Sequence, residues 1–194
     1  MSTVLAVGLA IGHTGAQPKS PYSVADTDIH LLGEPQWQVW VLAGGPRPQD
    51  RSWSRADLAR EAAAHGVAGF DAAYEDLLAR RLLVETDPAG TWARTVRFHP
   101  LLNGLGKLDA DGTEYGLGLL GETPLVHLDR DAYDAWQWLP FTPTVGAAAE
   151  TLKLASGPDG WAAVAERVSG LLAMDVGYLI SVPGTTGEQR GSPG

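Results

Sequence analysis

The chain has 194 residues, of which 44% are hydrophobic and 19% are charged, and this length fits one large domain or two small ones. It contains no cysteine, which excludes disulfides, zinc–thiolate sites, iron–sulfur clusters and thiol nucleophiles and fits the reducing cytoplasm, where we expect the protein to reside. The net charge of −9 argues against a surface that binds phosphate over its whole extent.

The basic residues are concentrated in the middle of the chain. Eight of the fourteen are arginines between residues 47 and 97, and the same segment carries eight acids. Any contact with a polyanion is therefore expected in this segment. The alternative interpretation is that these arginines pair with neighbouring acids and solvate helices.

An apolar stretch, residues 4–11, opens the N-terminal segment of strands and turns that we assign to residues 1–34. No basic residue precedes Lys19, so the charged start of a signal peptide is missing. The stretch is predicted to be a buried β-strand or a short core helix. No run reaches the ~18 apolar residues that a membrane span needs, and no membrane partner is expected.

Two helices are predicted next. Apolar residues at 37, 40 and 41 have helical spacing, and the Gly–Gly–Pro sequence at 44–46 ends this first helix. Ser54 is a good N-cap residue and is followed three residues later by Asp57, so a second helix is expected over residues 55–65. Gly66 is well placed to end it.

A third helix and two strands follow. Phe70, Tyr74, Leu77 and Leu78 lie on one face of an amphipathic helix that runs to about Leu82. Residues 82–86 are strand-like, residues 87–90 form a strong turn, and residues 91–98 alternate as a returning strand. The sequence therefore predicts that these two strands pair as a hairpin.

The order helix, helix, turn, helix, strand, turn, strand resembles the winged helix-turn-helix family of DNA-binding regulators. The sequence from Trp53 to Arg60 and the "Asp-Leu-Leu-Ala-Arg-Arg-Leu-Leu-Val" sequence that ends at Val84 strengthen the resemblance. It covers residues 35–98, which we assign to one winged-helix unit. It implies that the third helix enters the major groove, that basic wing residues contact phosphate, and that the protein is a homodimer.

The resemblance also implies which residues would contact DNA. They belong to the second helix, the end of the third helix and the wing: Arg55, Arg60, Arg80, Arg81, Thr91, Trp92, Arg94 and Arg97. The first half of the third helix departs from this pattern, because Asp71, Glu75 and Asp76 would repel phosphate. Trp92 would stack on bases if exposed, or pack against the third helix if buried.

The rest of the chain is predicted to form a glycine-rich β-hairpin connector over residues 99–124, with a tight turn at 109–112. Residues 125–182 are predicted to form a second helical, winged-helix-like unit. In this repeat, Tyr133 and Trp136 correspond to Trp37 and Trp40 of the first unit. The fold class is therefore α+β, with one winged-helix unit or two in tandem. Residues 183–194 are expected to be a disordered tail.

No catalytic chemistry is predicted. The glycines before Lys107 do not form a phosphate-binding loop, because Leu108 stands where serine or threonine is needed. The histidines at 13, 30, 65, 99 and 127 do not have metal-ligand spacing, and no nucleophile motif accompanies them. We therefore expect a non-enzymatic protein without cofactor or metal.

Two functions remain open. The first, which we prefer because it is the commonest use of this fold, is that of a DNA-binding transcriptional regulator. The second is that of a module that binds a protein or peptide and does not bind DNA, and it resembles the small winged-helix domains that capture leader peptides between a strand edge and the third helix. The acidic charge, the seven tryptophans and the acidic third helix favour this second function.

Overall fold

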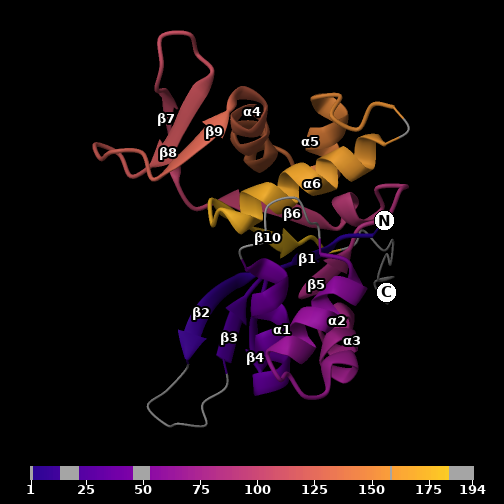
Figure 1. The fold of residues 1–194 in the computed structure, drawn as a ribbon. Helices are drawn as coiled ribbons and strands as arrows, with labels where there is room; N and C mark the ends of the chain where they lie inside the picture. Colours follow the sequence, from indigo (N-terminus) through magenta and orange to yellow (C-terminus); the bar gives the residue numbers. More distant parts are fainter. Residues whose placement is uncertain (1, 14–21, 46–52, 158, 184–194) are drawn as a thin grey trace, which may run out of the picture.

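The computed structural model describes residues 2–13, 22–45, 53–157 and 159–183 of the chain. The fold is α+β, as predicted, with helices packed against several antiparallel sheets (Figure 1). Two units lie one above the other in Figure 1. Strands β1, β5, β6 and β10 lie where the two units meet.

The first unit contains a three-stranded antiparallel sheet, three helices and a short two-stranded pair. The elements are β1 (Val4–Ala6), β2 (Leu9–His13), β3 (Tyr22–Ala25), β4 (Ile29–Leu32), α1 (Glu34–Gly44), α2 (Arg55–Ala64), α3 (Phe70–Ala79) and β5 (Leu83–Glu85). The strands pair in the orders β2-β3-β4 and β1-β5. The apolar stretch at the N-terminus therefore forms two successive strands, β1 and β2, which confirms the prediction of a strand over that of a helix.

Helix α2 begins and ends where the sequence indicated, whereas α3 ends at Ala79, before the predicted end near Leu82. Ser54 and Asp57 form a full capping box at the start of α2, in which each side chain accepts a hydrogen bond from the backbone N–H of the other residue. α2 ends before Gly66, which adopts a left-handed conformation with φ of 71°. α1 ends at Gly44, ahead of the prolines.

The second unit follows from residue 92. Its elements are a 3₁₀ turn η1 (Trp92–Arg94), β6 (Val96–Pro100), β7 (Asn103–Lys107), β8 (Glu114–Gly118), β9 (Val126–Asp129), α4 (Arg130–Trp138), a 3₁₀ turn η2 (Leu139–Phe141), α5 (Val145–Thr151), α6 (Gly160–Ala173) and β10 (Gly177–Ser181). The predicted hairpin is β7–β8, and β9 extends it to a three-stranded sheet. The tail at 184–194 lies outside the described residues.

The two units have the same order of elements, strands included. In each, a short strand precedes a three-stranded sheet, three helices and a final strand that pairs with the first one. The register agrees in detail, because Tyr22 pairs with Leu32 in one unit and Tyr115 pairs with Leu128 in the other. Each first hairpin also shifts register by one residue, at Ile11 and at Leu105. The chain therefore consists of two structural repeats.

The turn from the third helix into the last strand is also repeated. Arg81 and Asp175 both follow a helix end and both have positive φ, 59° and 53°. The next residues, Leu82 and Val176, donate to carbonyls five residues back at 2.9 and 3.3 Å. Arg81 and Asp175 therefore occupy the same position in the two units. Only the side chain differs, and it changes from basic to acidic.

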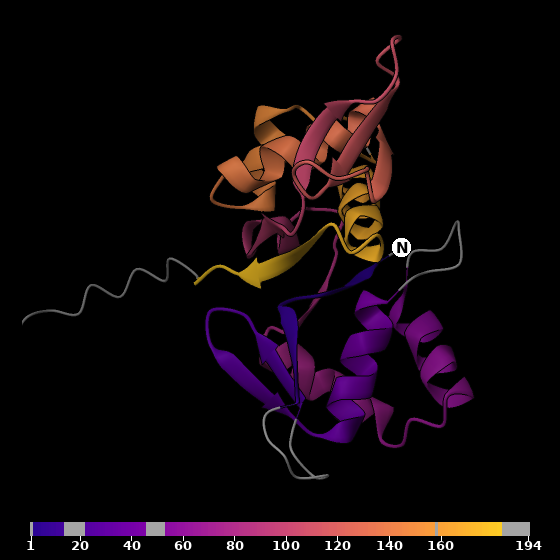
Figure 2. The ribbon, with the colours of Figure 1, turned by 90° about the vertical axis from the view of Figure 1, so that its left-hand side faces the viewer.

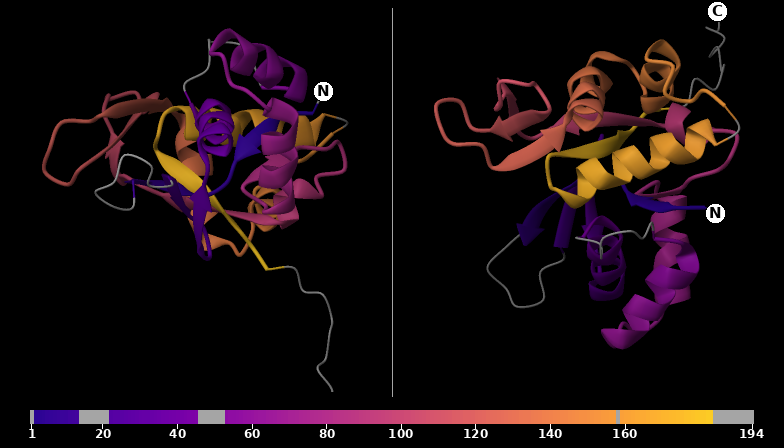
Figure 3. Two further views of the ribbon diagram at one scale, coloured as in Figure 1. Left: turned by 90° about the horizontal axis from the view of Figure 1, so that it is seen from below. Right: turned by 45° about the horizontal axis from the view of Figure 1, so that its top comes forward.

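Two apolar cores result, and β1 contributes to both. The first core lies among α1, α2, α3 and the β2–β4 sheet, and the second lies among β6, β8, β10 and α4–α6. Val4 and Ala6 belong to the first core, whereas Leu5 and Val7 belong to the second, because successive side chains of a strand point to opposite faces. Strand β1 therefore lies between the two units, near β10 (Figures 2 and 3).

The predicted wing is wrong. Strand β5 pairs with β1, and β6 pairs with β10, so the segments at 82–86 and 91–98 do not pair with each other. The side chain of Asp87 accepts hydrogen bonds from the backbone N–H groups of Ala89, Thr91 and Trp92. These bonds coil the chain into a 3₁₀ turn at the point where the sequence indicated an extended strand.

Candidate functional site

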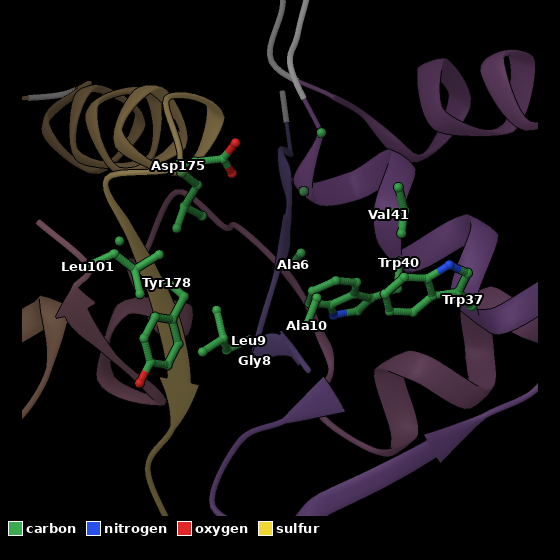
Figure 4. A pocket seen from close by; sticks show the side chains of 14 residues that line it. Ala6, Gly8, Leu9, Ala10, Trp37, Trp40, Val41, Leu101, Asp175 and Tyr178 are labelled. Carbon is green, nitrogen blue, oxygen red and sulfur yellow. The ribbon is translucent and has the colours of Figure 1, made fainter. Parts of the chain in front are cut away.

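A cleft opens between the two units, on the side where α1 faces the end of α6 (Figure 4). Its volume is about 270 Å³. The lining is largely apolar and comes from distant parts of the chain: Ala6, Gly8, Leu9, Ala10, Trp37, Trp40, Val41, Gly44, Gly45, Leu101, Leu172, Asp175, Gly177 and Tyr178. Both repeats are needed to form it.

Two glycines of the cleft lining are packed tightly against neighbouring elements. Gly8 has φ of 101°, and a β-carbon there would overlap Cγ1 of Val24. A β-carbon on Gly44 would lie 3.3 Å from Cβ of Ala6, so helix α1 packs closely on strand β1. A larger side chain at Gly44 would push α1 away from β1, and one at Gly8 would displace Val24 of β3.

One wall of the cleft is aromatic. The rings of Tyr22 and Trp37 stack at 4.6 Å between centroids, and Trp37 stacks on Trp40 at 5.6 Å. Trp40 is nearly buried, and its Nε1 donates to the carbonyl oxygen of Val7 at 2.9 Å. Trp37 is half-buried, so its ring presents part of its surface to the cleft. The wall is therefore rigid and suited to apolar or cationic groups.

The opposite wall comes from the second unit. Tyr178 stacks on His99 at 5.5 Å, and Leu101, which is 45% exposed, lies beside it. Burial, together with the positive charge of Arg97, lowers the pKa of His99. Figure 4 shows the carboxylate of Asp175 above Leu101 and Tyr178, on the same wall. Asp175 is exposed, and no ion pair involves it in the described part of the chain.

Three of the four arginines predicted to contact DNA from the second and third helices make ion pairs within the first unit, whereas Arg81 makes none within the described residues. Arg55 contacts Asp71 at 3.2 Å and Glu75 at 2.9 Å, and its guanidinium lies 4.7 Å from the centre of the Tyr74 ring. The two remaining pairs are Arg60 with Asp57 and Arg80 with Asp76, the latter at 3.4 Å. Arg80 also donates to the carbonyl of Leu31 at 3.0 Å.

The residues predicted on the wing lie apart from that group, at the start of the second unit and, for Thr91, in the turn before it. Arg94 pairs with Glu150 at 3.5 Å, and Arg97 donates to the carbonyl of Pro140 at 3.0 Å. Thr91 donates to Asp87 at 2.6 Å. Trp92 is 2% exposed and belongs to the second core, so it packs neither on bases nor on α3.

Hydrogen bonds also fix the turn before these residues. Burial acts to raise the pKa of Asp87, but the bonds from Thr91, Trp92 and Ala89 outweigh it and lower the pKa. Asp87 therefore stays ionised and holds the 3₁₀ turn in place.

The cleft between the two units was not predicted from the sequence. The residues of the cleft are spread over four segments of the chain, and none of these segments forms a motif. The available signal was the repeat itself, because two stacked units leave a junction between them. Comparison with models of known families, with curated proteins and with solved structures gave no match. Among the described helices, none is both long enough and apolar enough to cross a membrane.

Proposed function

We propose that this chain is a non-enzymatic binding protein made of two α+β repeats, and that the cleft between them captures a segment of a partner protein. The observation that carries the proposal is the cleft: an aromatic wall from α1, a second wall from β10, and one charged group, Asp175. The described lining offers two titratable side chains, Asp175 and Tyr178, without a histidine or an acid–base pair. Binding is therefore better supported than catalysis.

The chemistry of the lining defines the ligand. The volume of about 270 Å³ lies below the ~300–1,000 Å³ of sites for drug-sized molecules, which suits a side chain of a peptide. The aromatic wall favours a bulky apolar group, and Asp175 favours a basic neighbour. We infer that the partner presents an extended segment in which an apolar side chain adjoins a lysine or arginine. The net charge of −9 also favours a basic partner.

DNA binding is less well supported than peptide binding. Four of the predicted contact residues are arginines paired with acids of this chain: Arg55, Arg60, Arg80 and Arg94. A phosphate group would have to displace these carboxylates. The acids that hold Arg55 lie on α3, the helix that would enter the major groove in a winged helix. The prediction of DNA binding stays untested and is one outcome of the experiment below.

In the experiment, the full chain is titrated into short labelled peptides of the pattern apolar–basic–apolar, and binding is measured by fluorescence anisotropy. Ala10→Trp fills the cleft from an exposed position on β2 and is expected to weaken binding at least about tenfold. Asp175→Asn removes the charge and is expected to weaken binding about threefold and to abolish the preference for lysine over glutamine. Asparagine suits the positive φ at this position.

The matched control is Glu122→Gln, which removes one exposed acid from the turn between β8 and β9 and should leave the affinity unchanged. The same chain is also titrated with labelled random duplex DNA at ~50 and ~200 mM salt. Peptide binding that is insensitive to Ala10→Trp contradicts the proposed site. Tight DNA binding that falls steeply with salt supports the DNA-binding regulator in place of the peptide-binding module.

A further inference from the structure

A second groove lies where strand β5 meets the residues around Thr95 and the end of β10. Its volume is about 330 Å³. It is lined by Val7, Leu78, Arg81, Leu83, Val84, Glu85, Arg94, Thr95, Val96, Ser181 and Val182. None of the residues of the first cleft takes part in it.

One wall of this groove is built from the positions that form a wall of the first cleft. Leu78, Arg81 and Val84 of the first repeat correspond to Leu172, Asp175 and Tyr178 of the second. The correspondence rests on the backbone, because Arg81 donates to Leu78 at 3.0 Å and Asp175 donates to Leu172 at 3.1 Å. The repeat thus presents the same wall twice.

The charge of the wall is reversed between the two sites. Arg81 is exposed, and no ion pair with it occurs within the described residues. Arg94 is the second cation of the groove, and its pair with Glu150 at 3.5 Å joins two exposed side chains, which makes it weak. Glu85, the acid of the lining, accepts a hydrogen bond from the hydroxyl of Tyr74 at 2.6 Å.

We propose that this groove binds a carboxylate carried on an apolar body. Arg81 and Arg94 supply charged N–H donors, which form shorter and stronger hydrogen bonds with carboxylates than neutral donors do. Leu78, Val84 and Val182, which are partly exposed, supply the apolar surface that receives the body of the ligand, and Val7, Leu83 and Val96 of the lining are buried. Such a group occurs at the C-terminus of a peptide and in a free acylated amino acid. The proposal does not depend on the ligand of the first cleft.

The test is an NMR titration of the full chain, labelled with ¹⁵N, against two probes of matched shape. N-acetyl-leucine carries the carboxylate, and N-acetyl-leucinamide lacks its charge. We expect shifts at the amides of Val84, Thr95 and Val182 and an affinity for the acid about tenfold above that for the amide. A peptide that ends in leucine, with a free or an amidated terminus, distinguishes the two sources of the group.

Two variants locate the donors. Arg81→Asn keeps a residue that tolerates positive φ, and Arg94→Gln provides a second variant in case the first is destabilised. Each should reduce the preference for the acid to about twofold or less. Arg130→Gln, an exposed arginine of α4 that lies 3.8 Å from Asp134, is the control and should leave it unchanged.

The proposal is overturned by equal binding of acid and amide, by shifts centred on Val41 and Tyr178 of the first cleft, or by an equal loss in the Arg130→Gln variant. Inorganic phosphate provides a further check. If phosphate displaces N-acetyl-leucine at equal concentration, the apolar body contributes nothing and the proposed ligand class is wrong.

Discussion

Gly90 lies directly against the indole of Trp161, so that a β-carbon at residue 90 would overlap the ring. Gly90 ends the turn that links the two units, and Trp161 stands in the first turn of α6. The contact joins the linker to the second unit and explains why the chain has no side chain at that position.

Gly90→Ala is therefore expected to destabilise the protein by about 2 kcal/mol or more. Part of the loss comes from φ of 70°, which disfavours alanine, and the rest comes from the displaced indole. Gly66→Ala is a matched control, because Gly66 has φ of 71° and a β-carbon there would meet no atom within 4 Å. It should cost about 1 kcal/mol, measured like the first variant by urea unfolding. Equal losses in the two variants would show that the Trp161 contact contributes nothing.

The partly buried imidazole of His99 predicts a loss of stability in mild acid. Burial lowers the pKa of His99 below its ordinary value of about 6.5, and the charge of Arg97 adds to this effect. The folded state therefore binds fewer protons than the unfolded state. The contribution of His99 is complete above about pH 6.5 and declines as the pH falls below that value.

His99→Phe keeps an aromatic ring against Tyr178 but cannot be protonated. Urea unfolding between pH 7 and pH 5 should show a smaller decline in the free energy of unfolding for this variant than for the native chain. The Nε2 atom of His99 is buried and has no hydrogen-bond partner among the described residues, so loss of that atom should itself cost little. Identical pH slopes for both proteins would rule out His99 as the source.

The start of α2 offers a test of local stability. Ser54→Ala removes the acceptor for the N–H of Asp57 at 3.2 Å and should cost about 1 kcal/mol. Thr144 caps α5 in the equivalent position and accepts from Ala147 at 3.1 Å. Thermal unfolding of Thr144→Ala should show a loss of similar size. A much larger loss in only one of the two variants would contradict the equivalence of the caps.

The two charge-removing variants used above should fold normally. Arg81 and Asp175 both have positive φ, which asparagine adopts more readily than most residues. Arg81→Asn and Asp175→Asn are each expected to change the free energy of unfolding by less than about 1 kcal/mol. Circular dichroism combined with urea unfolding checks this. A large loss of stability would mean that the side chains of Arg81 and Asp175 support the fold.

The sequence predicted the local features of this fold better than the distant ones. The cap at Ser54, the end at Gly66 and the apolar spacing of α3 are read within one helix, and all three predictions are confirmed. The wing was mispredicted because β5 finds its partner in β1, which lies far away in the sequence, and because the side chain of Asp87 coils the intervening chain. A sequence pattern that predicts a strand does not indicate which other strand it will pair with.

The candidate sites could not be predicted for the same reason. The arginines from Arg55 to Arg97 form a conspicuous cluster in the sequence, yet the structure divides them between the two units and pairs most of them with acids. The first cleft, in contrast, joins Trp37, Leu101 and Tyr178, which have no relation in the sequence. Its location follows from how the repeats stack.

The repeat makes each half of the chain a guide to substitutions in the other. The same backbone turn carries a basic residue, Arg81, in the first repeat and an acidic residue, Asp175, in the second, and both turns have the same geometry. Tyr133 likewise shows that the stacking position of Trp37 accepts a phenol, since each ring lies 4.6 Å from the tyrosine of its own sheet. Residues exchanged between equivalent positions are therefore expected to fit the backbone of the other repeat. The ligand preference of one groove could then be changed with the side chains of the other.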